Sequence, residues 1–187
     1  MIQAHIQARP LCKAALLLHL LSFFVAANSP EISFADLVSH LRHLEVNEAN
    51  ARVNFEKGLT YQLLADAAKS DATGSGTSKY VSYLDKDLLL RNSEESYRDC
   101  LAEDPRNTDA LSNLAKILSE SNNGRSDDNI IANVLELYER AFSSGQNLHI
   151  QIYMNYGLFL RELGRLQHAM MIFSQGLLRY PNELMLR

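Results

Sequence analysis

Apolar residues recur along most of the chain at the spacing of an α-helix. In residues 31–46 they approximate the i, i+3, i+4 and i+7 pattern of one helical face. In residues 48–69, Phe55, Leu59 and Leu63 stand at intervals of four. The whole chain contains only 4 prolines and 8 glycines, so few residues break a helix. The pattern therefore predicts an all-α protein.

Two polar stretches interrupt the helical pattern, at residues 70–79 and 120–128. Both are rich in small and polar residues, a composition typical of loops. The first stretch resembles a phosphate-binding loop only superficially, because that motif needs G-x-x-x-x-G-K-[ST]. Gly74 and Gly76 stand too close together for it, and Lys79 does not follow a glycine. Both stretches are therefore predicted to be loop inserts.

The first 30 residues contain no acidic residue. Arg9 and Lys13 precede an apolar run over residues 14–27. As a helix this run would span about 21 Å, which is short of a hydrocarbon core about 30 Å thick. A basic start, a short apolar run and small residues before a cut after Ala27 are typical of a secretory signal peptide. Residues 1–27 are thus predicted to be a signal peptide or anchor that directs the chain to the ER lumen or out of the cell.

Three alternatives to a cleaved secretory signal stay open for this segment. It could be an uncleaved anchor, an organelle transit peptide, or the product of a misplaced start in a cytosolic protein. If the segment is not cleaved, residues 11–27 are the part expected to contact a membrane.

Three segments share a pattern of side-chain sizes at offsets 0, 4, 7 and 12. The order is a small or medium residue, an aromatic residue, a small residue and a helix breaker, with glutamine as the last residue of the middle set. The sets are Ser93, Tyr97, Cys100 and Pro105; Val134, Tyr138, Ala141 and Gln146; and Ala169, Phe173, Gly176 and Pro181. A matching large, large, small, large pattern precedes two of them, at Leu111, Leu114, Ala115 and Leu118 and at Tyr153, Tyr156, Gly157 and Leu160.

These positions resemble those of the tetratricopeptide repeat family over residues 48–187. The copy from Tyr153 to Pro181 matches throughout, the middle copy needs extra residues between its helices, and the first copy would use Gly58 and Tyr61. The resemblance implies an antiparallel helical-hairpin solenoid of about three repeats, with residues 30–47 as an N-terminal capping helix. In such a fold each hairpin buries its apolar face against its neighbours.

Charge and residue clusters argue against several functional classes. A nucleic-acid-binding domain usually has a basic excess, whereas this chain has 18 Lys and Arg, 22 Asp and Glu, and a formal net charge of −4. Cys100 is the one cysteine after residue 27, and zinc needs about four clustered ligands. His40 and His43 have no third ligand at metal spacing. Since no catalytic constellation is visible, we expect neither enzyme activity nor a cofactor or metal site.

Asn113 and Asn155 occupy the same position in the first helices of the last two copies. In the repeat family this position lies on the concave surface, where some members use asparagines to hydrogen-bond the backbone of an extended peptide. An amide suits this role because it offers two donors and an acceptor. Lys116 and Arg161 are expected to face the same groove and to attract a carboxylate. The alternative is that asparagine is simply common at this position.

The resemblance therefore implies a non-enzymatic scaffold that binds a peptide or a partner segment in its concave groove. The alternative is an accessory or regulatory region of an enzyme or larger assembly whose catalytic domain is absent from this chain. Leu184, Met185 and Leu186 are apolar, whereas a solenoid usually ends in a polar capping surface. We expect either a longer chain or a partner or oligomer contact at that end.

Overall fold

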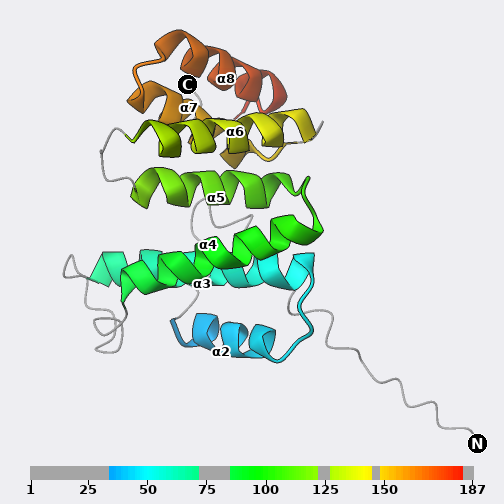
Figure 1. Ribbon diagram of the computed structural model, residues 1–187. Coiled ribbons are helices and arrows are strands. Elements are labelled where there is room, and N and C mark those ends of the chain that lie inside the picture. The colour runs from blue at the N-terminus through cyan, green and yellow to red at the C-terminus, as the bar shows by residue number, and fades with distance from the viewer. Residues whose placement is uncertain (1–33, 72–84, 122–126, 145–147, 183–187) are drawn as a thin grey trace, which may run out of the picture. The chain divides into compact units, whose positions relative to one another are not determined.

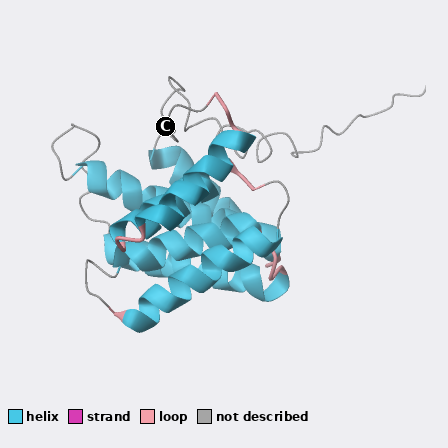
Figure 2. Ribbon diagram, turned by 90° about the horizontal axis from the view of Figure 1, so that it is seen from above, coloured by secondary structure: helices cyan, strands magenta, loops and turns pink. Residues whose placement is uncertain are grey.

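The computed structural model of the protein describes residues 34–71, 85–121, 127–144 and 148–182. Within these ranges the chain forms seven α-helices and no strand, which confirms the all-α prediction (Figures 1 and 2). The helices are α2 (Phe34–Glu45), α3 (Ala51–Asp71), α4 (Lys86–Glu103), α5 (Thr108–Ser121), α6 (Asp128–Ser144), α7 (Ile150–Glu162) and α8 (Leu166–Arg179). The predicted signal segment, residues 1–27, lies outside the described residues.

Polar side chains fix several of the helix starts. Asn50 Oδ1 accepts a hydrogen bond from the backbone N–H of Val53 at 3.0 Å, just before α3. Asp85 caps α4 by accepting from two backbone N–H groups, at 3.0 and 3.2 Å. Asn107 caps α5 by accepting from the N–H of Ala110 at 3.0 Å. Such caps satisfy backbone donors that have no partner inside the helix.

The helix ends differ from the sequence prediction by a few residues at both loop inserts. Helix α3 extends to Asp71, so residues 70 and 71 are helical rather than the start of a loop. Helix α5 ends at Ser121 and α6 begins at Asp128, so both ends of the predicted insert at 120–128 are helical too. The remainder of the two predicted inserts, apart from Asp127, lies outside the described residues.

The helices of residues 34–182 pack with their neighbours along the chain (Figure 1). Helices α3 and α4 form one pair, α5 and α6 a second, and α7 and α8 a third. Between pairs, α4 packs on α5 and α5 packs on α7, while α2 packs on α3. Because α5 packs on α7, the first helices of the second and third pairs are neighbours.

In the turn from α7 to α8, Gly164 has a φ of +72°, a conformation that favours glycine.

Within two pairs, a glycine on the first helix faces an aromatic ring on the second. A Cβ atom added to Gly58 of α3 would lie 2.7 Å from two ring carbons of Tyr97 on α4. A Cβ atom added to Gly157 of α7 would lie 2.7 Å from Cδ1 of Phe173 on α8, and closer still to two other ring atoms. Ser93 also donates a hydrogen bond to the backbone oxygen of Gly58 at 2.7 Å. The small residues thus permit close approach of the paired helices.

The three sets of repeated positions on α4, α6 and α8 form much of the core. Seven of their residues are buried: Ser93, Tyr97, Cys100, Val134, Tyr138, Ala141 and Ala169. Gly176 is buried as well, and Phe173 is half-buried. The periodic size pattern in the sequence therefore identifies residues that the fold encloses.

Aromatic rings join the second helix pair to the third. Tyr138 of α6 stacks on Tyr156 of α7, with ring centroids 4.8 Å apart and planes 17° apart. Phe142 meets Tyr153 edge to face, with centroids 5.3 Å apart. Aromatic pairs of this geometry add stability beyond the area that they bury. Across the described ranges, none of the helices combines the length and apolar character needed to cross a membrane.

Candidate peptide-binding site

Asn113 lies on α5, between residues of the apolar core. Its neighbours Ser112 and Leu114 are buried, while its own side chain is half-buried. The side-chain Nδ2 donates a hydrogen bond to the hydroxyl oxygen of Tyr97, at 3.1 Å. Part of the Asn113 amide is therefore used inside the fold, where it joins α5 to α4.

Tyr97 is the centre of a polar network in the core. Its side chain has no exposed surface, and its hydroxyl donates to Oε1 of Gln62 at 3.0 Å. Burial raises the pKa of Tyr97, and the hydrogen bond from Asn113 opposes this shift. The hydroxyl therefore stays protonated and links α5 to α3 through α4. A buried tyrosine normally needs such a partner.

Asn155 has a different environment on α7. Its side chain is half-buried, and its Oδ1 accepts a hydrogen bond from Nε2 of Gln151 at 3.0 Å. The two residues are four apart, so this contact lies on one face of the helix. Gln151 Oε1 is buried and has no hydrogen-bond partner among the described residues. The Asn155 amide is thus held by its own helix rather than by another one.

The two cations predicted at the site, Lys116 and Arg161, lie on α5 and α7, the helices that also carry Asn113 and Asn155. Lys116 Nζ is 3.7 Å from a carboxylate oxygen of Glu120, with both side chains partly exposed on α5. Arg161 is exposed near the end of α7. Exposed ion pairs of this kind are weak and leave the charge accessible to water. A carboxylate ligand could therefore compete for Lys116.

The structure brings the four predicted residues onto two neighbouring helices. Asn113 and Lys116 lie on α5, Asn155 and Arg161 lie on α7, and these two helices pack against each other. Chemically, the set offers amide groups and two positive charges, which suits polar and anionic ligands. It offers no nucleophile paired with a base.

A charged cluster between α2 and α3 was not anticipated from the sequence. Glu56 is buried; its Oε1 accepts a hydrogen bond from Nε of Arg52 at 2.9 Å, and its Oε2 lies 4.0 Å from Nε2 of His40. Burial lowers the pKa of His40, Glu56 opposes this, and the neighbouring His43 lowers it further. The i, i+4 spacing of Arg52 and Glu56 was the available sequence signal.

No other arrangement in the described ranges suggests metal or thiol chemistry. There, His, Cys, Asp and Glu form no group of three that could hold a metal ion. Burial raises the pKa of Cys100 to about 11, so its thiol is protonated at neutral pH and poorly reactive. Comparison with protein-family models, with curated proteins and with solved structures found no match.

Proposed function

We propose that this protein is a non-enzymatic interaction scaffold of tetratricopeptide type, which binds a peptide or partner segment along its first helices. The observation that supports this most directly is the repeated contact of a small residue with an aromatic ring. It occurs between Gly58 and Tyr97 in one helix pair and between Gly157 and Phe173 in another. The same close crossing in the first and the third helix pair supports a repeated hairpin, the unit from which such solenoids are stacked.

The proposed ligand is an extended segment that carries a carboxylate. Its backbone would meet amides on α5 and α7, and its carboxylate would meet Lys116 or Arg161. Asn113 gives one N–H to Tyr97, but an amide has a second N–H and a carbonyl oxygen. Asn155 has the equivalent position on α7. A hydrogen bond to a charged group is worth about 1.5–3 kcal/mol, so the cations should contribute more affinity than the amides.

The test compares variants that keep the core intact. A partner is captured with the full chain from secretory-pathway extract, and its binding segment is measured by calorimetry against purified protein. Replacing both Asn155 and Arg161 with alanine should weaken binding at least tenfold. The matched control is Ser143→Ala, an exposed change on α6. Equal affinity of the double variant and the parent for that segment would refute a binding site on the first helices.

A further inference from the structure

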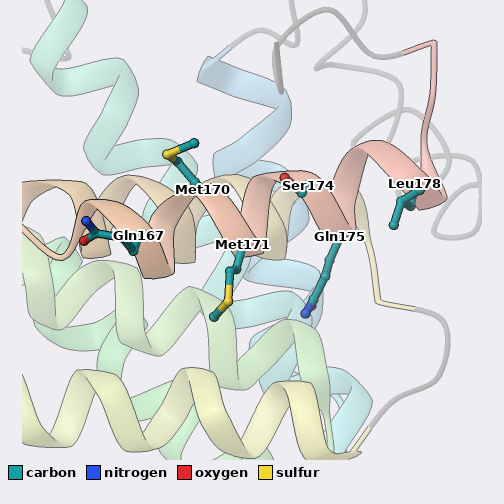
Figure 3. A pocket seen from close by; sticks show the side chains of 6 residues that line it. All are labelled: Gln167, Met170, Met171, Ser174, Gln175 and Leu178. Carbon is teal, nitrogen blue, oxygen red and sulfur yellow. The ribbon is translucent and has the colours of Figure 1, made fainter.

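Polar side chains at the surface of this protein differ in how firmly they are held. A shallow depression on α8 is lined by side chains of that helix alone: Gln167, Met170, Met171, Ser174, Gln175 and Leu178 (Figure 3). All six are exposed, and within the described ranges no hydrogen bond ties the polar ones to another helix. The amide of Asn113, in contrast, is bonded to a side chain of the preceding helix pair. A side chain held in one orientation can select a ligand by its donors and acceptors.

The direction of the hydrogen bonds around Tyr97 determines which way the Asn113 amide faces. A tyrosine hydroxyl has one hydrogen to donate. Tyr97 donates it to Oε1 of Gln62 on α3, at 3.0 Å, so its oxygen can only accept from Asn113. Nδ2 of Asn113 donates that bond, at 3.1 Å. The side-chain nitrogen of Asn113 therefore points to Tyr97, and its side-chain oxygen, Oδ1, is left for a ligand.

Burial makes this orientation firm. Tyr97 has no exposed surface, and Gln62 is 8% exposed. Burial also raises the pKa of Tyr97, so the hydroxyl keeps its proton. If the Asn113 amide turned over, its oxygen would face the oxygen of Tyr97, and a buried hydroxyl would lose a donor. Such a loss is unfavourable because water cannot replace the missing partner.

The amide of Asn155 on α7 is held in the opposite sense and less firmly. Its Oδ1 accepts from Nε2 of Gln151, at 3.0 Å, so its two N–H groups are left for a ligand. Both residues are half-buried, and Oε1 of Gln151 is buried without a partner in the described ranges. Turning both amides over would let that oxygen accept from Asn155. Asn155 can therefore offer donors or an acceptor, whereas Asn113 is held with its oxygen outward.

We infer, on the basis of the proposed function, that Tyr97 is a positioning residue for the peptide site on α5 and α7, and that this site requires a backbone N–H of the ligand at Asn113. Tyr97 and Gln62 are too deeply buried to touch the ligand. They hold Oδ1 of Asn113 outward, where it accepts the N–H of an extended segment. A ligand that presents only acceptors at this place is rejected, because two acceptors repel each other. Holding the amide in advance also lowers the entropy cost of binding.

The test uses the full chain and a synthetic probe, an acetylated peptide of five alanines with a free carboxylate. This probe offers the backbone and the carboxylate of the proposed ligand without larger side chains. A set of analogues replaces one N–H at a time by an ester oxygen, and binding is followed by NMR of ¹⁵N-labelled protein. The analogue with its ester at Asn113 should bind the parent about fivefold more weakly than the probe, because one neutral hydrogen bond corresponds to about 2- to 12-fold. Equal binding of all analogues would overturn the inference.

Protein variants then show whether Tyr97 is responsible. In Tyr97→Phe the ring stays against Gly58 without its hydroxyl, and in Gln62→Met the hydroxyl loses its acceptor and can donate to Asn113 instead. In both variants the Asn113 amide can turn, so the loss caused by the ester should fall below about twofold. Weaker folding alone would reduce binding of the probe and its analogues alike and would leave their ratio unchanged. Tyr138→Phe is the matched control, because in the described ranges its hydroxyl bonds to neither asparagine, and it should keep the fivefold ratio. A fivefold ratio in either Tyr97→Phe or Gln62→Met would overturn the inference.

Hydrogen exchange of the side-chain amides tests the geometry without the probe. One Nδ2 proton of Asn113 should exchange with water about tenfold more slowly than those of Asn155, and Tyr97→Phe should abolish this protection. Equal exchange at the two residues in the parent would overturn the inference and leave the proposed peptide site standing. If neither the probe nor any analogue shifts the signals of Asn155 and Arg161, the peptide site itself is refuted, and the inference falls with it.

Discussion

Replacing Gly157 with alanine tests the close crossing of α7 and α8 directly. The added Cβ would lie 2.7 Å from Cδ1 of Phe173 and closer to Cε1 and Cζ. Carbon atoms in favourable contact are about 3.5–4.0 Å apart, so the ring must move by about 1 Å. Overpacking of this kind costs about 1–3 kcal/mol, and the upper end applies because several ring atoms are involved. Alanine in a helix gains about 1 kcal/mol over glycine, so the net loss of stability should be about 2 kcal/mol.

A double-mutant cycle separates this steric clash from other effects. With Phe173→Leu already present, the obstructing ring is gone, and Gly157→Ala should be neutral or should stabilise by up to about 1 kcal/mol. Gly164→Ala is the control, because Gly164 has a φ of +72° and no atom within 4 Å of an added Cβ. It should cost about 1–2 kcal/mol in both backgrounds. Urea melts followed by circular dichroism give the free energies of unfolding. An equal loss for Gly157→Ala in both backgrounds would refute the contact.

Three other changes have measurable outcomes. Asn113→Ala should lower the free energy of unfolding by about 1–2 kcal/mol, because the buried Tyr97 hydroxyl loses a hydrogen-bond donor. Asn155→Ala should lower it by less than about 0.5 kcal/mol. Equal urea midpoints for the two variants would contradict this difference. Burial lowers the pKa of His40 below 6.5, so at mildly acidic pH the unfolded chain binds more protons than the folded chain. The free energy of unfolding should therefore fall as the pH drops below about 6.5. Melts at several pH values should show a smaller dependence of this free energy on pH in His40→Gln than in the parent. N-terminal sequencing of protein from the secretory pathway should begin near Asn28, and an intact Met1 on a soluble cytosolic protein would contradict the predicted cleavage.

The periodic pattern of the sequence was sufficient to locate most of the core. Offsets 0, 4 and 7 on α4 and α6 predict burial, and all six residues there are at most 1% exposed. The pattern works because these offsets lie on one face of a helix. It was less informative about helix ends, since α3 and α5 continue into stretches whose polar composition suggested loops. A polar composition indicates that these stretches are exposed to water, and it does not determine at which residue the backbone hydrogen bonds of a helix end.

The environment of the two asparagines could not be predicted from the repeat alone. Asn113 and Asn155 have the same offset, but only Asn113 is bonded to a tyrosine of the preceding helix. The difference depends on the register of α5 against α4, which no spacing within one helix specifies. A buried hydroxyl needs partners, but Tyr97 and Tyr138 both carry one at the repeated aromatic position, so this signal does not distinguish Asn113 from Asn155. That argument would have pointed to a polar neighbour without naming it.

Residues of the site proposed on α5 and α7 and residues of α8 should respond differently to substitution because their packing differs. The hydrogen bonds from Asn113 through Tyr97 to Gln62 tie three helices together, so a change at Asn113 alters stability as well as any ligand contact. Helix α8 packs chiefly against α7, and its exposed side chains take no part in that network. In a protein whose units contact mainly their neighbours, such an outer helix can change its chemistry at little cost to the rest. A substitution on the exposed side of α8 should therefore leave the free energy of unfolding nearly unchanged, whereas Asn113→Ala should lower it, because only Asn113 belongs to a hydrogen-bond network that joins three helices.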